Sequence, residues 1–402
     1  MSGAAPVCPR VFLATTIPMP HVGGSWTHYS YLMSGLSARN ALAGALNGRD
    51  LRPAWAARGS AIARSLGSRD RYLGQATGLV MQRLMDCIRA KDRNGAARPD
   101  VVHTHDPIAS WAVKQSVWRD IPLVQTVHGP LLEEMVMFGH GETSHYYRAA
   151  KSAQEQAFAR VDHFIAVDTG QKEILLSQGV RDALITVIPN AVDLAALERI
   201  ACASSPVTQK PYMLVPRRLV PKNGVEYVVR ALRMIPSELR PRLYVAGDGA
   251  LRQSLHDLAA GLGVADQIVF LGAVPREEVI GLAVHARAVL VPSVPASGVV
   301  EATSLAALEG MGLGRVVIAS NIGGLAEVLS DGLTGILVRP GDPAAWAAAM
   351  ASVMRLTNEQ RRALGQRARD CVQLRFETGV WMAAIEGVYR QACARCRGSL
   401  DP

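Results

Sequence analysis

Two glutamates, eight positions apart, are the residues of this chain whose type and spacing could carry out chemistry. Glu301 and Glu309 flank the segment Ala302–Leu308, which favours a helix and begins with small residues. Eight residues of helix rise about 12 Å, which is close to the span from a ribose to a sugar across a diphosphate. The start of a helix also presents unpaired backbone N–H groups and a positive partial charge. The pair therefore predicts a site for a sugar linked to a nucleoside diphosphate; the alternative is a pair of surface glutamates.

The segment between the glutamates assigns a place to each part of such a ligand. We expect the diphosphate on the backbone of Thr303, Ser304 and Leu305, with the sugar near Glu301 and the ribose near Glu309. A diphosphate that departs in a reaction develops negative charge, so basic side chains are needed beside it.

Basic residues of this kind follow a predicted strand at 212–215. Arg217, Arg218 and Lys222 lie in the segment VPRRLVPKNG, and both arginine and lysine bind phosphate charge. The alternative is a basic loop with solvated side chains. The next predicted strand ends in a glycine-containing turn that would let the backbone approach a flat base: Gly247, Asp248 and Gly249.

These residues depend for their positions on short apolar strands that alternate with helical segments. Five strands are predicted in the first half, at 11–17, 101–102, 123–127, 164–167 and 185–188. After a polar linker at 202–211, six more are predicted at 212–215, 243–246, 268–271, 289–291, 316–319 and 336–338. Such alternation is typical of parallel sheets with helices on both faces. We predict an α/β protein of two Rossmann-like, doubly wound domains that face a central cleft, with ligands at the carboxyl ends of the strands.

Residues 39–98 interrupt this pattern, and we predict no strand within them. They carry 12 basic and 4 acidic residues, which accounts for eight of the nine net positive charges. Mostly apolar side chains recur in them at helical spacing: Leu73, Thr77, Val80, Leu84 and Ile88. One interpretation is a solvated helix that packs this stripe on the sheet. The other is a basic amphipathic surface for an anionic membrane or an acidic partner.

Length and composition favour two folded domains. Of 402 residues, 49% are apolar and 19% charged, which excludes a disordered chain and a charged coiled coil. The net charge of +9 is confined to one stretch, so we expect no nucleic-acid partner. We expect no membrane span and no signal peptide. Six scattered cysteines, with Cys393 and Cys396 as a lone CxxC, favour reduced thiols. We therefore expect a cytoplasmic protein, with 39–98 as a candidate contact with the inner face of the membrane.

Eleven short motifs, in order along the chain, resemble the retaining glycosyltransferases of family 4, which have two Rossmann-like domains in the GT-B fold. The first half contains HVGGSW (21–26), VVHTHD (101–106), TVHG (126–129) and VIPNAVD (187–193). The second half contains RRLVPKNGV (217–225), LYVAGDGALR (243–252), IVFLGAV (268–274), VLVPS (289–293), Glu301 with Glu309, VVIASNIGG (316–324) and DGLTGILVRPGD (331–342). The resemblance covers nearly the whole chain except 39–98. It implies an acceptor-binding domain at 1–205, a nucleotide-sugar domain at 206–375 and a C-terminal helix at 376–402 that crosses back to the first domain.

The resemblance implies roles for the matching residues of the second half. Arg218 and Lys222 would hold the diphosphate, with Arg217 as a substitute for Arg218. Glu309 would bond the ribose hydroxyls, and Glu301 the sugar hydroxyls. The other donor contacts would come from Gly23, Gly24, Gly247, Asp248, Gly249, Val274, Thr303, Ser304 and Leu305.

Roles in the first half concern the reacting carbon and the acceptor. His128 would stand beside C6 of the donor sugar and the carbon that reacts; the alternative is a capped core histidine. The acceptor would meet His105, Asp106 and Trp26. The nature of the acceptor stays open between a small natural product, a sugar lipid and a surface-polysaccharide intermediate.

Several positions depart from the family pattern. Arg217 stands where glycine is usual, and Lys222 comes one residue early, so that Asn223 occupies the usual lysine position. Thr303 and Ser304 replace a common Phe-Gly. Ala191 and Arg315 replace a usual glycine and a usual proline. These differences bear on the identity of the donor more than on the reaction.

The expected reaction is the transfer of a hexose-type sugar, with UDP as the favoured nucleotide, from the nucleotide sugar to an acceptor hydroxyl with retention of configuration. No aspartate-any-aspartate triplet occurs, so we expect no metal and no cofactor beyond the nucleotide sugar. The departing phosphate oxygen would take the acceptor proton.

The alternatives are a sugar phosphorylase or epimerase, a non-catalytic sugar- or lipid-binding relative, and a dinucleotide-dependent oxidoreductase. The last needs a GxGxxG after the first strand, which HVGGSW does not supply.

Overall fold

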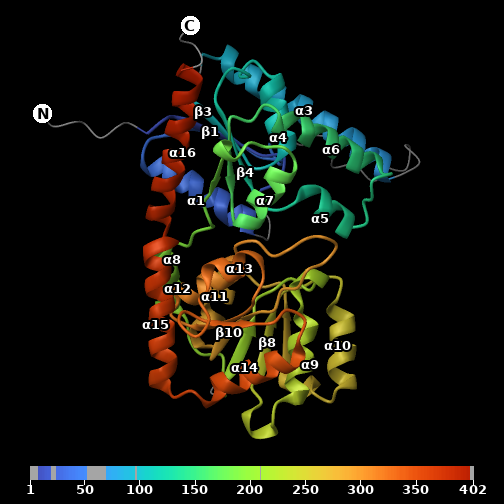
Figure 1. Ribbon diagram of the computed structural model, residues 1–402, viewed down its shortest axis with the longest axis vertical. Helices are drawn as coiled ribbons and strands as arrows, with labels where there is room; N and C mark the ends of the chain where they lie inside the picture. Colours follow the sequence, from blue (N-terminus) through green and yellow to red (C-terminus); the bar gives the residue numbers. More distant parts are fainter. Residues whose placement is uncertain (1–7, 20–23, 52–68, 96, 209, 399–402) are drawn as a thin grey trace, which may run out of the picture. The chain divides into compact units, whose positions relative to one another are not determined.

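The chain was analysed as a computed structural model, which describes residues 8–19, 24–51, 69–95, 97–208 and 210–398 (Figure 1). It divides into two compact units, which are described separately. Unit 1 comprises Met1–Ile188 and Met382–Pro402, and unit 2 comprises Pro189–Trp381. The chain therefore changes unit within the VIPNAVD segment and returns within its last helix, α16 (Thr378–Gly398). In the part of the chain that the structure describes, no helix is both long enough and apolar enough to cross a membrane.

Unit 1 is built on a parallel sheet with the strand order β2-β1-β3-β4-β5-β6. Its strands are β1 (Val11–Ala14), β2 (Leu42–Leu46), β3 (Val101–Thr104), β4 (Leu123–Val127), β5 (His163–Ala166) and β6 (Ile185–Val187). The inner strands β3, β4 and β5 are buried along their whole length. More than half of their residues are apolar, because both faces of such a sheet are covered by helices.

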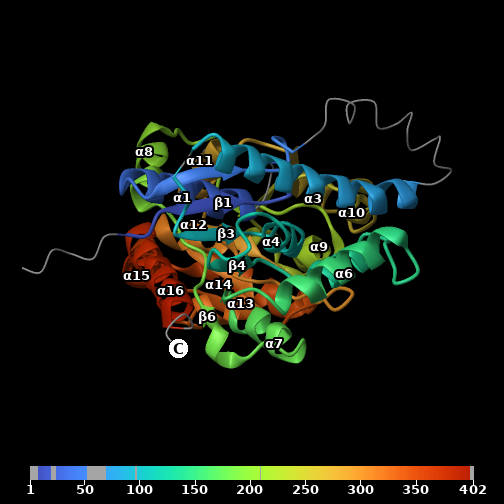
Figure 2. The same ribbon diagram turned by 90° about the horizontal axis from the view of Figure 1, so that it is seen from above.

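The helices of unit 1 pack on both faces of this sheet. They are α1 (Gly24–Ala38), α3 (Arg69–Arg93), α4 (Pro107–Gln115), α5 (Leu131–Met137), α6 (His145–Phe158) and α7 (Thr169–Ser177), with a 3₁₀ turn η2 (Asp182–Leu184). Asp106 and Asp168 begin α4 and α7 as N-caps directly after β3 and β5. Helices α3 and α6 lie side by side (Figure 2). The predicted stripe of α3 is confirmed, because Leu84 and Ile88 are fully buried in the core of unit 1.

The prediction that 39–98 contains no strand was wrong, because β2 (Leu42–Leu46) pairs in parallel with β1. The sequence LAGAL has no β-branched residue, so its strand propensity is weak. Its support comes from packing: a Cβ at Gly44 would lie 2.9 Å from the ring of Phe12 on β1. An alanine at this position would press against that ring, so glycine lets this edge strand approach the sheet.

Unit 2 contains a second parallel sheet, with the order β12-β11-β10-β7-β8-β9. Its strands are β7 (Tyr212–Val215), β8 (Arg242–Ala246), β9 (Ile268–Gly272), β10 (Ala288–Val291), β11 (Val316–Ser320) and β12 (Ile336–Val338). Counted from the first strand of this unit, the order is that of a dinucleotide-binding Rossmann sheet, and its direction of winding reverses between β7 and β10. The predicted α/β class with two doubly wound sheets is confirmed.

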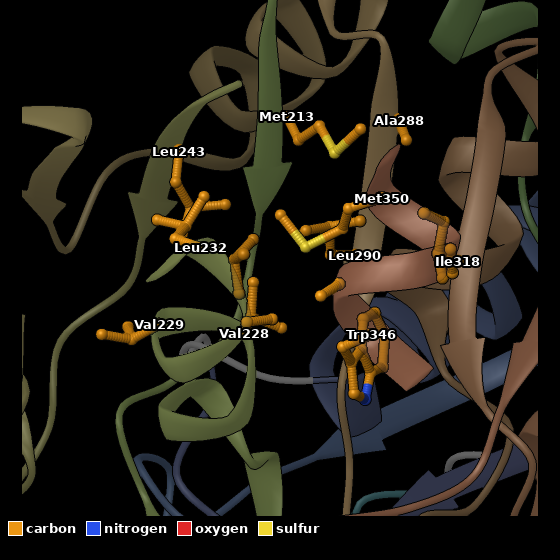
Figure 3. Packing of buried hydrophobic residues seen from close by; sticks show 14 of the residues in the cluster. Met213, Val228, Val229, Leu232, Leu243, Ala288, Leu290, Ile318, Trp346 and Met350 are labelled. Carbon is orange, nitrogen blue, oxygen red and sulfur yellow. The ribbon is translucent and has the colours of Figure 1, made fainter. Parts of the chain in front are cut away.

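Helices cover both faces of this second sheet. They are α8 (Leu194–Ala203), α9 (Val225–Met234), α10 (Arg252–Gly261), α11 (Arg276–His285), α12 (Leu305–Gly312), α13 (Gly323–Val328), α14 (Pro343–Arg355) and α15 (Asn358–Arg375), with 3₁₀ turns η3 (Pro221–Asn223), η4 (Ser237–Leu239) and η5 (Ala265–Gln267). Helices α9, α10 and α14 bury one face, where Trp346 and Met350 of α14 belong to the same buried cluster as Leu290 of β10, and Met350 lies beside Leu290 (Figure 3). Helices α8, α11, α12 and α13 bury the other.

Candidate active site

The predicted donor residues of unit 2 follow neighbouring strands at the point where the winding of the sheet reverses. Arg217 and Arg218 follow β7 after one intervening proline, and Ser293 follows β10 in the same way. Because β7 and β10 are adjacent and parallel, their carboxyl ends open side by side. This is where open α/β sheets bind their ligands.

A buried ion pair between Arg217 and Glu301 lies at this point. The guanidinium spans both carboxylate oxygens, with Nη1 at 2.9 Å from Oε1 and Nη2 at 2.7 Å from Oε2. The exposed fractions of the two side chains are 9% and 12%. The alternative of a pair of surface glutamates is therefore wrong for Glu301, whose side chain is 12% exposed and faces a cation.

Other side chains hold the same guanidinium in place. Nη2 of Arg217 also donates to Asn223 Oδ1 at 2.6 Å and to Ser293 Oγ at 2.8 Å. Nη1 lies 3.3 Å from Ser304 Oγ. Arg217 is thus the centre of a polar network, whereas Arg218 is exposed. Asn223 occupies the usual lysine position of the family and serves here as an acceptor for Arg217.

Charge at this network keeps Glu301 ionised. Burial by itself would raise the pKa of Glu301, but Arg217, Lys222 and Ser293 together outweigh it and hold that pKa below its ordinary value. A carboxylate in this state accepts hydrogen bonds from hydroxyls and does not donate a proton at neutral pH. Ser293 also donates to this carboxylate, so Arg217 and Ser293 together leave one of its four lone pairs for a further donor.

The helix between the two glutamates begins later than predicted. Helix α12 starts at Leu305 with Ser304 as its N-cap, so Thr303 precedes the helix. The rise of about 12 Å expected for a continuous helix from Glu301 to Glu309 therefore does not describe this segment. The reason is a close approach by Gly324, whose N–H donates to Glu301 O at 3.0 Å. A Cβ at Gly324 would lie 2.5 Å from Thr303 N. The Ser304 side chain makes no capping bond, which leaves the first N–H groups of α12 without a side-chain cap.

Glu309 lies one turn further along α12 and pairs with Arg276 at the start of α11. Nε and Nη2 of Arg276 lie 2.7 Å and 2.6 Å from the same oxygen, Oε1. Burial raises the pKa of Glu309, and the charge of Arg276 offsets this only in part. The second oxygen, Oε2, is the one that Arg276 leaves for another donor such as a ribose hydroxyl.

The remaining predicted donor residues of unit 2 lie on loops after β7, β8 and β9. Lys222 is half-buried on η3, and its charge acts on Glu301. Gly247 and Gly249 are required by packing, because a Cβ there would lie 2.0 Å from Arg217 O and 2.4 Å from Leu219 O. Their turn therefore supports the arginine loop; its contact with a base stays a prediction. Asp248 is exposed, and Val274 lies between β9 and α11.

Three histidines gather at the carboxyl ends of β3 and β4 in unit 1. His105 follows β3, His128 follows β4, and His28 projects from α1. His105 Nδ1 lies 3.1 Å from His128 Nε2, and the ring of His28 stands at 90° to that of His128 with centroids 4.6 Å apart. Burial, together with the neighbouring histidines, lowers the pKa of His105 well below its ordinary value, so its ring is neutral at neutral pH.

The other predicted acceptor residues differ in how the fold uses them. Both carboxylate oxygens of Asp106 are occupied: Thr15 and Thr16 donate to it, and it caps α4 through Ala109 N at 2.8 Å. Trp26 stacks on Tyr29 within α1, which begins at Gly24. Gly23 lies outside the described residues.

Two residues of these sites, Arg276 in unit 2 and His28 in unit 1, were not predicted from the sequence. Arg276 lies 33 positions before Glu309, and no local pattern links the two. His28 lies one helical turn after Gly24, on the side of α1 that faces the sheet, and is 2% exposed. No pattern in the sequence marks this histidine, because its burial is known only from the structure. A cavity of about 440 Å³ elsewhere in unit 1, lined by Gln154, Phe158 and Gln178 among others, contains none of the predicted site residues.

Comparisons with known proteins match both halves of the chain. The family model described as Glycosyltransferase Family 4 matches residues 22–196, and the model described as Glycosyl transferases group 1 matches residues 199–370. A D-inositol 3-phosphate glycosyltransferase of Geodermatophilus obscurus is 32% identical over 66% of this chain, and the chain spans 62% of that protein, slightly less than two thirds. A glycogen synthase of Mycobacterium tuberculosis is 30% identical over 76% of this chain and 71% of its own.

Solved structures share the fold at lower identity. Sucrose-phosphate synthase from Thermosynechococcus elongatus superposes with a TM-score of 0.74 at 20% identity, over 96% of this chain and all of the other. Anabaena HepE in complex with UDP superposes with a TM-score of 0.67 at 16% identity, over 95% of this chain and all of the other. The chain therefore belongs to the family 4 glycosyltransferases and has their GT-B fold of two Rossmann-like sheets.

Proposed function

We propose that this chain is a retaining glycosyltransferase that moves a hexose-type sugar from a nucleoside-diphosphate sugar, with UDP as the favoured nucleotide, to an acceptor hydroxyl. The observation that carries the proposal is the Arg217–Glu301 pair beside the N-terminus of α12, with Glu309 on the same helix. Support for UDP comes from relatives of the same fold, since Anabaena HepE was solved with UDP and with UDP-glucose.

The donor is proposed to bind in unit 2 through both glutamates. Glu301, held ionised by Arg217, accepts hydrogen bonds from sugar hydroxyls, and Glu309 accepts them from the ribose through the oxygen that Arg276 leaves available. The uncapped N–H groups of α12, with Arg218 and Lys222, stabilise the charge that develops on the departing diphosphate.

Bond exchange at the sugar is proposed to occur on one face. The bond from C1 to the diphosphate breaks, a bond from C1 to the acceptor oxygen forms, and the departing phosphate oxygen takes the hydroxyl proton. No protein base is required, which agrees with the lowered pKa of Glu301. His128 is proposed to stabilise charge near the reacting carbon. Because Arg218, Lys222 and the helix dipole act on the diphosphate, we propose that the reaction needs no metal.

The acceptor is proposed to be a glycan, glycolipid or small molecule that meets unit 1 near His105 and Trp26. We also propose that α3 contacts anionic membrane. Arg83, Arg89 and Arg93 are exposed on this helix, while its apolar stripe packs inward.

The test is a product assay on the full chain with UDP-glucose, GDP-mannose and dTDP-glucose, in excess chelator, with and without an acceptor panel. The proposal expects the nucleoside diphosphate to be released only when an acceptor is present, with the anomeric configuration of the donor retained in the product by NMR. A sugar 1-phosphate formed with inorganic phosphate would indicate a phosphorylase. An altered sugar without acceptor would indicate an epimerase, and binding without release would indicate a non-catalytic relative.

Matched variants distinguish a loss of the proposed diphosphate contacts from a general effect of removing an arginine or lysine. Arg218→Ala and Lys222→Ala should each lower kcat by at least about tenfold, because a charge-assisted contact to the leaving group is lost. Arg230→Ala, on the exposed side of α9, should leave kcat unchanged. Equal rates for all three variants would contradict the proposed diphosphate site.

A further inference from the structure

The histidine cluster of unit 1 has a geometry that the proposed transfer does not require. One ring nitrogen from each of His28, His105 and His128 lies within 4.8 Å of those of the other two. His28 and His105 are 2% and 4% exposed, and His128 is half-buried. Three imidazoles from α1 and from the ends of β3 and β4 therefore converge on one small region.

His105 is less completely hydrogen-bonded than the histidine that stacks on it. The neighbouring ring of His103 stacks on His105 and has both nitrogens bonded, to Tyr389 Oη at 2.7 Å and to Thr126 Oγ1 at 2.8 Å. His105 has one such contact, to His128, and its Nε2 is buried with no hydrogen-bond partner. A buried nitrogen without a partner is costly in free energy. An ion held by Nδ1 of His105 would take the place of the contact with His128 and would fix the proton of His105 on Nε2.

Distances in the cluster fit a tetrahedral ion. Two histidine nitrogens that each lie 2.0–2.1 Å from one zinc stand about 3.3 Å apart. His105 Nδ1 and His128 Nε2 are 3.1 Å apart, and a nitrogen of His28 lies within 4.8 Å of a nitrogen of each, so His28 must move closer to complete the site. Asp106, the adjacent carboxylate, is taken by Thr15, Thr16 and Ala109 and is not a further ligand.

We propose that His28, His105 and His128 form a binding site for a divalent transition-metal ion of the zinc type. Imidazole nitrogens select zinc, copper, nickel and cobalt, whereas magnesium and calcium prefer oxygen ligands. Three neutral histidines leave the charge of the ion uncompensated and its fourth position open, as in three-histidine zinc sites. That position takes water or an anionic oxygen.

The ion has a consequence for activity, which rests on the proposed function. If His128 acts beside the reacting carbon, an ion bound to its ring removes it from that role. Micromolar Zn²⁺ then inhibits a transfer that proceeds in chelator. The binding of the ion itself does not depend on this role.

The test is a titration of the full, metal-free chain with Co²⁺, followed by the visible absorption that nitrogen ligands give this ion in a tetrahedral site, and by displacement with Zn²⁺. We expect one Co²⁺ per chain, and an affinity at least tenfold lower in both His28→Gln and His105→Gln. His256→Gln, an exposed histidine of α10, should bind Co²⁺ as the unaltered chain does. Cys393→Ser/Cys396→Ser should also retain the site.

Circular dichroism and Tm of the metal-free variants establish that they are folded, and His128→Gln serves as a third ligand variant because its ring is half-buried. Unchanged Co²⁺ affinity in the folded histidine variants, or loss of binding in the double cysteine variant, would overturn the metal site. Calorimetric binding of a nucleotide sugar in chelator reports on the proposed function alone, so failure of one proposal is distinguishable from failure of the other.

Discussion

Arg217 is the residue on which the candidate donor site is centred. It stands at a position where its family usually has glycine, and its guanidinium reaches Glu301, Asn223 and Ser293 at once. Arginine at the usual glycine position and asparagine at the usual lysine position are in contact, because Asn223 accepts a hydrogen bond from Arg217.

A double-mutant cycle measures the strength of this pair. Removal of one partner leaves a buried charge without compensation, so Arg217→Ala and Glu301→Ala should each lower the free energy of unfolding by about 3 kcal/mol. The double variant should cost less than the sum, with a coupling energy of about 2 kcal/mol in urea unfolding. Arg252 and Asp248, which form an exposed pair, supply the control, and their coupling should be under about 1 kcal/mol. Additive effects for Arg217 and Glu301 would show that the pair is not formed.

The residue at which helix α12 begins is determined by the packing of Gly324 and not by the helix propensity of its own segment. The segment from Ala302 has the composition of a helix, yet the backbone of Gly324 lies where the first turn would be. This contact explains why sequence reasoning placed the start of the helix too early.

Gly324→Ala tests the contact. The added Cβ would lie 2.5 Å from Thr303 N and 2.6 Å from Ala302 C, so the segment after Glu301 must shift. We expect at least a tenfold weaker affinity for the nucleotide sugar by calorimetry, together with a lower Tm. Gly261→Ala, at the end of α10, meets no atom within 4 Å and should leave the affinity unchanged. Equal affinities of the two variants would mean that the α12 N-terminus does not bind the donor.

Helix α16 is attached to the sheet of unit 1 through a histidine. Arg395 Nη1 lies 3.2 Å from His163 Nδ1 on β5, and Nε2 of His163 lies 2.8 Å from Thr186 Oγ1 on β6. Since a guanidinium only donates, Nδ1 is the acceptor and Nε2–H donates to Thr186. Burial, together with the charge of Arg395, lowers the pKa of His163 to about 4.

This histidine should make the stability of the protein depend on pH. Its pKa is lower in the folded chain than its ordinary value of 6.5, so the unfolded chain takes up the proton first as the pH falls. The stabilisation is complete above about pH 6.5 and decreases towards pH 4, by about 2 to 3 kcal/mol. Urea unfolding of the unaltered chain and of His163→Gln across this window should show a difference that shrinks as the pH falls. A difference that is constant with pH would contradict the assignment.

The fold as a whole was largely predictable from the sequence, because buried parallel strands are short apolar runs that end at glycine, proline or polar residues. All eleven predicted strands are present, with ends displaced by at most three residues. Strand β2 was missed because its support is the approach of Gly44 to Phe12, a contact between residues far apart in sequence. The glutamates were predictable as a pair; their partners Arg217 and Arg276 were not, since only tertiary packing brings these cations to them.

The net positive charge of the chain bears on whether it contacts an anionic membrane. Eight of the nine net positive charges lie in 39–98, a stretch of the sequence that contains none of the residues proposed to bind the donor. If α3 contacts anionic membrane, an Arg83→Gln/Arg89→Gln/Arg93→Gln variant should lose co-sedimentation with phosphatidylserine vesicles, by about 1 kcal/mol per side chain. Binding by the unaltered chain should weaken with added salt. Equal sedimentation of both proteins would show that this surface only solvates the chain.

The most direct test of the proposed function is calorimetric titration of the full chain with UDP-glucose, GDP-mannose and dTDP-glucose in excess chelator. We predict one binding site for a nucleotide sugar, strongest for the UDP form, and at least a tenfold loss of affinity in Glu309→Gln, because a hydrogen bond to a charged acceptor contributes about 1.5–3 kcal/mol. Glu278→Gln, an exposed glutamate of α11, should bind as the unaltered chain does. Absence of binding for all three sugar nucleotides, or equal affinity in Glu309→Gln and the unaltered chain, would contradict the account.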